Sequence, residues 1–326
     1  MLKIGSLELS SNLILAPMAG ISDLPFRLLN RGYGCELAFV EMINVRSLSY
    51  RSKKTAQMLS TNQDDKPLGI QLLGCEPQFI RRALDILKKY QFDILDFNAA
   101  CPAKKITRRG EGASLLCEPK KLAMLLKIIV EASSVPVTVK IRAGWDAASL
   151  NARDAALLAQ DAGVSGLFIH GRTKSQGYSG KVDYRIIAEV KKALQIPVIA
   201  SGDILSSQLA KKMFDETGCD GVAVARGSLG NPWIFKQTTE LLGRRLVIKH
   251  PCLDEVTAVM SKHLDACIDF YGEKNGVIIF RKFFNWYTKG LRKIRQLREK
   301  SFRAKTRQDM AGIINVICRD WACPCP

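Results

Sequence analysis

The chain has 326 residues, of which 47% are hydrophobic and 25% charged, and its formal net charge is +18. This composition is ordinary for a globular protein, so it excludes an intrinsically disordered chain, and the length suits one large domain with a smaller one. A positive excess of this size attracts a polyanion, either nucleic acid or an acidic membrane surface.

Short apolar runs alternate with helical patterns over the first 243 residues. The predicted strands are 13–17, 37–41, 68–72, 94–98, 137–141, 166–170, 197–201 and 221–225. Between them, apolar spacing predicts amphipathic helices at 79–90, 119–133, 153–163, 184–194 and 206–218. Near-continuous apolar strands joined by helices indicate an α/β fold with a parallel sheet. Eight such units, and no G-x-G-x-x-G turn after the first strand, favour a closed (β/α)₈ TIM barrel over an open doubly wound sheet.

The strand pattern stops after Phe235, and helical periodicity then predicts helices at 253–270, 277–297 and 306–321. A linker is expected near 242–251, because the proline of His250-Pro251 disfavours helix in the residue before it. Residues 244–326 contain 17 Lys and Arg against 8 Asp and Glu, and their net charge of +9 is half of the +18 of the whole chain. We therefore predict a catalytic barrel at 1–243 and a small, basic, all-helical RNA-binding domain at 244–326.

The sequence also bears on the cellular compartment. Glu8 precedes any apolar run of signal-peptide length, and no segment reaches the ~20 apolar residues of a membrane span. Ten irregularly spaced cysteines are typical of reduced thiols, and the closing Cys318, Cys323 and Cys325 lack the paired CxxC of a metal clip. We expect a cytoplasmic protein without a membrane partner or a bound metal. We also expect a monomer, although the sequence leaves the oligomeric state open.

One predicted strand ends in a polar amide and a thiol, Asn98 and Cys101. Parallel α/β barrels place their chemistry at the carboxyl ends of strands, and Pro102 prevents the strand pairing from continuing. The thiol is therefore expected in a loop at the barrel mouth. The alternative is an inert, buried cysteine, which is what most free cysteines are.

The polar residues that end the other strands meet at the same face of a barrel, so they are expected to form one ring. In chain order the ring is Pro17-Met18-Ala19, Glu41, Gln71, Asn98 with Cys101, Lys140 with Arg142, His170 with Arg172, Ser201-Gly202-Asp203 and Ala225-Arg226-Gly227. Its basic centre, amides and late glycines suit an anionic planar cofactor with its phosphate near the last two strands, and flavin mononucleotide (FMN) is the candidate. Each of these residues could instead have a purely structural role. His170 could be a core histidine, Gln71 and Lys140 could be partly exposed strand ends whose polar groups reach solvent, and the glycines could be ordinary turn residues.

These motifs together resemble a known family, the tRNA-dihydrouridine synthases, in particular their bacterial B-type branch. The resemblance rests on Ala16–Gly20, Asn98–Pro102, Val139–Arg142, His170–Thr173, Ser201–Ile204 and Ala225–Gly227, and it continues through Gly230–Trp233 into the helical tail. Ala100 stands where many members carry glycine, which adds a methyl group close to the expected flavin. The resemblance implies reduction of the C5–C6 double bond of specific uridines in tRNA, with hydride passing from NADPH through FMN.

The resemblance also implies roles for individual residues. Cys101 would donate the proton to C5, and a thiol with an ordinary pKa of about 8.5 still carries its proton at neutral pH. The residues that would hold FMN are Pro17, Met18, Ala19, Gln71, Lys140, His170, Ser201, Gly202, Asp203, Ala225 and Arg226. Asn98 or Arg142 would hydrogen-bond the uracil carbonyls.

RNA contacts are expected from two basic segments. The first follows the thiol and contains Lys104, Lys105, Arg108 and Arg109. The second lies between Arg281 and Arg307, where 11 basic residues, including Lys293, Arg295 and Arg298, accompany a single acid. Aromatic side chains are interleaved there, and we expect most of them to pack the helices rather than stack on bases.

Other functions stay open at this point. A ribosomal-RNA uridine reductase is one variant, because phosphate attraction does not distinguish RNAs. A small-molecule FMN ene-reductase or dihydroorotate-type dehydrogenase could use the same barrel, but it does not need a cationic tail. A catalytically silent RNA-binding protein would leave the ring of polar residues unexplained. The sequence does not say which uridine is modified, or whether NADPH is preferred to NADH.

Overall fold

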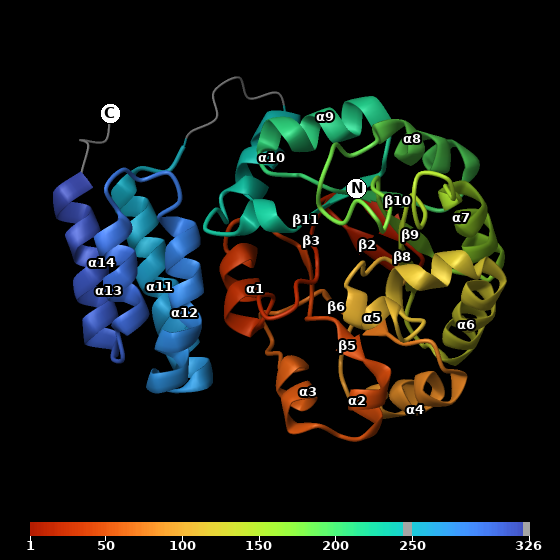
Figure 1. Cartoon of the computed structure of the whole chain (residues 1–326), viewed down its shortest axis with the longest axis horizontal. Coiled ribbons are helices and arrows are strands. Elements are labelled where there is room, and N and C mark those ends of the chain that lie inside the picture. The colour runs from red at the N-terminus through yellow and green to blue at the C-terminus, as the bar shows by residue number, and fades with distance from the viewer. Residues whose placement is uncertain (244–249, 322–326) are drawn as a thin grey trace.

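The computed structural model describes residues 1–243 and 250–321, with side chains as far as 317. Its centre is the predicted parallel barrel (Figure 1). The barrel strands are β3 (Leu13–Leu15), β4 (Leu37–Phe39), β6 (Leu68–Leu73), β7 (Ile94–Asn98), β8 (Val137–Arg142), β9 (Gly166–His170), β10 (Val198–Ser201) and β11 (Gly221–Val224). The barrel closes because β3 pairs with both β4 and β11, while β4 also pairs with β6. A short strand, β5 (Ile43–Asn44), adds a further pairing to β6.

An amino-terminal hairpin closes the end of the barrel away from the strand carboxyl termini. Strands β1 (Leu2–Ile4) and β2 (Leu7–Leu9) pair antiparallel. Leu2, Ile4 and Leu9 are buried in one cluster with inward-facing barrel residues such as Phe39 and Phe168. The barrel interior is therefore a packed core at this end, and a ligand has room only at the opposite mouth.

Helices surround the barrel, and the five predicted ones are present as α4 (Pro77–Leu87), α6 (Pro119–Ala132), α7 (Ala152–Asp161), α8 (Tyr184–Ala193) and α9 (Ser207–Thr217). The structure adds α1 (Leu24–Arg31), α2 (Val45–Ser49), α3 (Lys53–Met58), α5 (Lys104–Thr107) and α10 (Ile234–Leu242). Most of these are too short to show a clear helical period in the sequence. No helix among the described residues is long and apolar enough to cross a membrane.

Between residues 250 and 321 the structure describes four helices, α11 (Leu253–Tyr271), α12 (Glu273–Tyr287), α13 (Arg295–Arg303) and α14 (Arg307–Trp321). The predicted continuous helix at 277–297 was wrong, because the chain leaves the helical conformation at Thr288. Gly290 then has a φ of +92° and Lys293 a φ of +56°, which a helix cannot accommodate. Most of the predicted linker, and Cys323 and Cys325, lie outside the described residues.

The helical part packs against the barrel on the side of α1 (Figure 1). Phe26 of α1 and Phe283 of α12 stack with their ring centroids 5.5 Å apart. Gly230 lies so close to α12 that a Cβ there would come within 2.5 Å of the Trp286 backbone. Most of the five aromatic residues interleaved in the tail are packed as expected, because Phe283, Phe284 and Tyr287 are buried and Trp286 is partly buried, while Phe302 is 56% exposed. Barrel and tail therefore share a continuous core.

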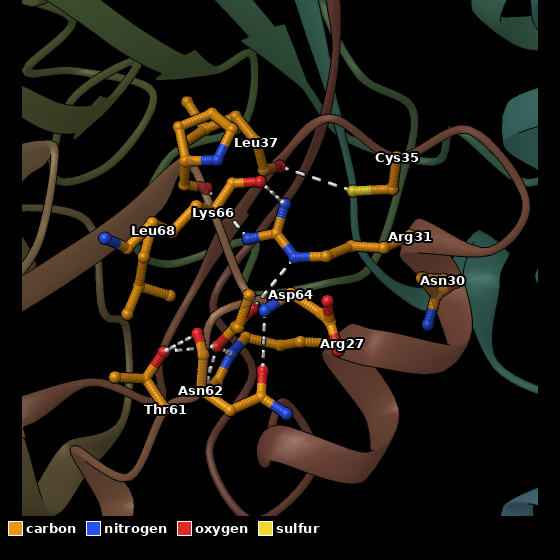
Figure 2. Close-up of polar contacts among 12 residues, drawn as sticks. Arg27, Asn30, Arg31, Cys35, Leu37, Thr61, Asn62, Asp64, Lys66 and Leu68 are labelled. Carbon is orange, nitrogen blue, oxygen red and sulfur yellow. Dashed lines mark hydrogen bonds and ion pairs between the residues drawn. The ribbon is translucent and has the colours of Figure 1, made fainter.

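Buried ion pairs hold α1 on the barrel. Arg27 and Asp65 pair at 2.7 Å with both side chains fully buried, and Arg31 reaches the same carboxylate at 2.8 Å. Figure 2 shows the polar contacts that link these arginines to the segment before β6. Because removing one member of such a network leaves an uncompensated buried charge, the position of α1 is strongly specified.

A candidate active site at the barrel mouth

A cavity of about 420 Å³ opens at the carboxyl ends of the barrel strands. Every residue expected to hold the cofactor lines it, namely Pro17, Met18, Ala19, Gln71, Lys140, His170, Ser201, Gly202, Asp203, Ala225 and Arg226. Cys101, Asn98 and Arg142 line the same cavity. Parallel strands of a closed barrel bring these positions together from all parts of the first 226 residues, whereas Glu41, Arg172 and Gly227 of the expected ring do not line the cavity.

The cavity wall also contains side chains that the strand-end argument did not select. Met42, Ile21 and Leu205 add apolar surface, and Tyr178 stands at the mouth with 61% of its surface exposed. The guanidinium of Arg226 lies 4.9 Å from the centre of the Tyr178 ring. Tyr178 lies eight residues beyond the end of β9, so only its spacing to His170 and Arg172 in the loop could have indicated it.

Lys140 brings a buried amine to the cavity. Its Nζ donates a hydrogen bond to Ser201 Oγ at 2.8 Å, and Ser201 in turn donates to the Ile169 carbonyl at 3.0 Å. Burial, and to a lesser degree Arg142, lowers the pKa of Lys140 below its ordinary value. An amine in this position needs an anion to compensate for its lost hydration.

The amides of Gln71 and Asn98 form a chain of hydrogen bonds along the wall. Asn98 Nδ2 donates to Gln71 Oε1 at 2.7 Å, and Gln71 Nε2 donates to the buried carboxylate of Asp96 at 2.7 Å. Burial raises the pKa of Asp96. Asn98 Oδ1 accepts the backbone N–H groups of Ala100 and Cys101 at 3.0 and 2.9 Å. Asn98 therefore shapes the turn that presents the thiol, and its amide is largely engaged within the protein.

Cys101 is partly buried at the cavity wall. Burial raises the pKa of its thiol, so the sulfur carries its proton at neutral pH. The loop that follows returns to this residue, because Ala113 N–H donates to the Cys101 carbonyl at 3.1 Å. Gly112, at a φ of +61°, lies so close that a Cβ there would come within 2.8 Å of the same carbonyl oxygen.

Arg142 is buried beneath the thiol loop. Its Nε donates to the carbonyl of Ala100 at 2.7 Å, and its Nη1 donates to the carbonyls of Thr173 and Gly177 at 2.9 Å each. Nη2 makes no hydrogen bond to the described part of the chain. Arg142 therefore ties two loops together and keeps one donor for a ligand. The methyl group of Ala100 is buried in this arrangement and lines the cavity.

His170 and the residues after β10 form the next part of the cavity wall, because β9 pairs with β8 and β10 pairs with β9. Burial, followed by the charges of Lys140, Arg142, Arg172 and Arg226, lowers the pKa of His170 to about 2, so the ring is neutral. Gly202 has a φ of +118°, and a Cβ there would come within 2.7 Å of the His170 ring. Asp203 pairs with Arg172 and, at 2.7 Å, with Arg226. Only glycine fits at 202, because both the space and the conformation exclude a side chain.

The remaining basic residues lie away from the cavity lining. Lys104, Lys105 and Arg108 are exposed on and after α5, in the segment that follows the thiol. Lys293 and Arg295 are exposed beside α13 and on it. Arg298 differs, because its Nη2 donates to the backbone carbonyl of Thr288 at 2.7 Å and so caps the end of α12.

The chemistry of the cavity fits the proposed flavin. Among the described residues, its lining includes three cations, Lys140, Arg142 and Arg226, but a single carboxylate, Asp203, which two arginines already neutralise. Apolar residues make up much of the remaining wall, and the volume is within the ~300–1,000 Å³ of ligand pockets. This combination suits an aromatic ring system that carries negative charge.

Comparisons with known proteins identify the family. A family model described as dihydrouridine synthase matches residues 14–319. The chain is 38% identical to tRNA-dihydrouridine synthase B of Pasteurella multocida over 290 residues, which is 89% of this chain and 87% of that protein. The chain belongs to the dihydrouridine synthase family. It is likewise 40% identical over 292 residues to a probable tRNA-dihydrouridine synthase of Rickettsia bellii, covering 89% of this chain and 90% of that relative.

More distant structures share the fold of this dihydrouridine synthase family member. The 6-hydroxypseudooxynicotine amine oxidase of Pseudomonas geniculata superposes with a TM-score of 0.57 at 13% identity. The match covers 81% of this chain and 52% of the oxidase, so this chain spans about half the length of that protein. At this identity, the likeness establishes the barrel and nothing about the reaction.

Proposed function

We propose that this protein reduces the C5–C6 double bond of specific uridines in tRNA to dihydrouridine, with FMN as the bound cofactor and NADPH as the hydride donor. Family membership supports the reaction class, because the relatives are named tRNA-dihydrouridine synthases. The observation that carries the proposal is the position of the Cys101 thiol in the wall of a cavity that Lys140, Arg142 and Arg226 also line. The predicted cytoplasmic location and monomeric state stay predictions.

The residues of this chain divide into those that hold the cofactor and those that act on the base. Bound FMN would supply hydride to C6 of the uridine. Lys140 and Arg226 would provide positive charge for an anionic ligand, and Gly202 in the turn after β10 would offer it backbone without a side chain in between. His170 stays neutral and so acts as a hydrogen-bonding group rather than a cation.

Cys101 supplies the proton that completes the reduction. Hydride addition at C6 leaves negative charge that is neutralised when C5 takes a proton, and a thiol that holds its proton at neutral pH is a suitable acid. The free donor of Arg142 is available to a uracil carbonyl. Asn98 keeps the thiol turn in place through two backbone hydrogen bonds.

The basic tail supports RNA as the substrate. A uridine in folded RNA must leave its stack to enter the cavity, at a cost of a few kcal/mol, and phosphate contacts offset that cost. The exposed residues Lys104, Lys105, Lys293 and Arg295 are available for such contacts. A small-molecule reductase on this barrel would have no use for them.

The proposal is tested by mapping dihydrouridine in RNA from cells with and without the gene for this protein. We expect one or a few tRNA positions to lose dihydrouridine in the deletion strain and to regain it when the purified protein, FMN and NADPH are added to that RNA. Dihydrouridine lost from ribosomal RNA instead would assign the alternative RNA substrate. Unchanged RNA in both pools would refute an RNA-uridine reductase.

A further inference from the structure

The loop at 16–23, between β3 and α1, forms one wall of the cavity and turns its tip away from it. Ala16, Pro17, Met18, Ala19 and Ile21 line the cavity. Gly20, at the tip, has a φ of +71° and does not line it. Its N–H donates to the carboxylate of Glu41, which follows β4. Its carbonyl accepts a hydrogen bond from Lys282, which belongs to α12 of the helical tail.

The barrel fixes the carboxy-terminal end of this loop. Met18 N–H donates to Ser22 Oγ at 3.0 Å, and the Ser22 carbonyl accepts from Arg27 Nη1 at 2.8 Å. Arg27, which is labelled in Figure 2, is the buried partner of Asp65. These contacts lie entirely within the barrel, so they hold Ser22 whether or not the tail is in place.

The helical tail holds the loop at two further points. Tyr271 of α11 donates its hydroxyl hydrogen to Asp23 Oδ2 at 3.0 Å, while Asp23 Oδ1 accepts from Phe26 N–H at 3.0 Å and caps α1. The Lys282 ammonium lies 4.9 Å from the centre of the Phe283 ring, and Phe283 stacks on Phe26. The Lys282 contact therefore rests on the packed aromatic interface between α1 and α12.

We propose that Lys282 and Tyr271 are positioning residues for the cofactor site, so that the helical tail supports the loop that forms one wall of the cavity in addition to binding RNA. The inference rests on the proposed FMN site. A cation hydrogen-bonded to a backbone carbonyl holds a loop more firmly than water does, because charge-assisted hydrogen bonds are stronger than neutral ones. Without Lys282, the tip at Gly20 keeps its contact with Glu41 alone, and residues 17–21 sample conformations that do not fit the ligand.

The test compares four variants of the full chain, Lys282→Met, Lys282→Arg, Lys274→Met and Tyr271→Phe. Lys282→Met keeps the aliphatic stem beside Phe283 and removes the donor, whereas Lys282→Arg keeps a cationic donor. Lys274→Met removes the same charge from an exposed position at the start of α12 and serves as the control. The dissociation constant of FMN is measured by titrating apoprotein and following flavin fluorescence, and hydrogen exchange of residues 16–23 is measured in the apoprotein.

We expect Lys282→Met to raise the FMN dissociation constant roughly tenfold and to speed exchange in the loop, with Lys282→Arg restoring most of both and Lys274→Met changing neither. Tyr271→Phe, which removes only the hydroxyl, should give a smaller change of the same sign even if Lys282→Met folds poorly. Wild-type protein that binds no FMN would refute the proposed function, and exchange would then still test the loop contact. Equal FMN affinity and equal exchange in wild type, Lys282→Met and Tyr271→Phe would overturn the inference.

Discussion

Lys140 on β8 donates a hydrogen bond to Ser201 on β10 at 2.8 Å, across the intervening strand β9. Inward-facing side chains of alternate strands meet in the same layer of a barrel, which explains how residues 61 positions apart come into contact. Among the described residues no carboxylate forms a salt bridge with this amine, although the buried Asp96 carboxylate attracts its charge from farther away. The contact leaves the charge of Lys140 available to a ligand.

The first prediction concerns Lys140. Lys140→Met should raise the FMN dissociation constant at least about tenfold without lowering the stability of the apoprotein, because an apolar side chain replaces a poorly solvated charge. Calorimetric titration with FMN and thermal unfolding of the apoprotein measure the two effects. If FMN binds the variant as tightly as wild type, Lys140 does not pair with the cofactor.

The affinity for FMN should also depend on pH through Lys140. Burial lowers the pKa of this amine, so its charge is lost at a lower pH than the ~10.4 of an ordinary lysine. An anion binds the protonated form, and the affinity is therefore expected to fall as pH rises through the alkaline range. Titrations between pH 6 and pH 10 should show this fall in wild type and a flatter profile in Lys140→Met.

The second prediction concerns the proton donor. Cys101→Ala should keep its FMN and its oxidation of NADPH but form dihydrouridine at least ~100-fold more slowly, because general-acid groups contribute 10²–10⁴-fold. Since burial raises the pKa of Cys101, the wild-type rate should hold to a higher pH than an ordinary thiol would allow. Single-turnover reoxidation of reduced flavin by unmodified tRNA measures both. A fully active alanine variant would exclude Cys101 as the acid.

The third prediction distinguishes two effects on the reaction: displacement of Cys101 by a new side chain, and backbone strain in the loop that follows Cys101. Gly112→Ala and Gly110→Ala both place a side chain at positive φ, at +61° and +74°, so each should lose about 1 kcal/mol of stability or more. Only at 112 does the new Cβ meet Cys101, within 2.8 Å of its carbonyl oxygen and 3.0 Å of its Cβ, whereas at 110 the nearest atom is Cys75 Sγ at 3.7 Å. Uridine reduction should therefore fall much further in Gly112→Ala than in Gly110→Ala, with FMN content equal. Equal rates in the two variants would contradict the role given to Gly112.

The fourth prediction distinguishes RNA contacts from structural ones in the tail. Lys293→Ala and Arg295→Ala should weaken tRNA binding and each reduce the slope of log K against log salt by about 1, without changing thermal stability. Arg298→Ala should in addition lower the stability of the tail, because its guanidinium caps α12 at Thr288. Binding titrations at several KCl concentrations, together with thermal unfolding, separate the two. If both Lys293→Ala and Arg295→Ala show the salt slope of wild type, then α13 and the residues just before it do not contact RNA.

Much of the fold was predictable because its signals are local. Each of the eight barrel strands is a short apolar run, and its side chains need burial on both faces, so the sequence alone indicates a covered parallel sheet. The helix prediction failed at 277–297, where apolar spacing continues past the real end of α12. The helix ends at Thr288, where Arg298 donates hydrogen bonds to the Thr288 side chain and carbonyl. Apolar periodicity cannot indicate a contact with a residue ten positions further along the chain.

The sequence by itself determined which types of side chain stand at the strand ends, because the residue at each position defines its chemistry. It therefore determined that the site is cationic, rich in amides and contains a thiol. Only the tertiary structure decided how those groups are used. In the folded protein the Asn98 amide holds the thiol turn, and two arginines neutralise Asp203. Folding also brings Tyr178 to the cavity and the tail residue Lys282 to the loop that forms one of its walls. These outcomes depend on contacts between residues far apart in the chain, whose energies exist only once the barrel and the helices have packed.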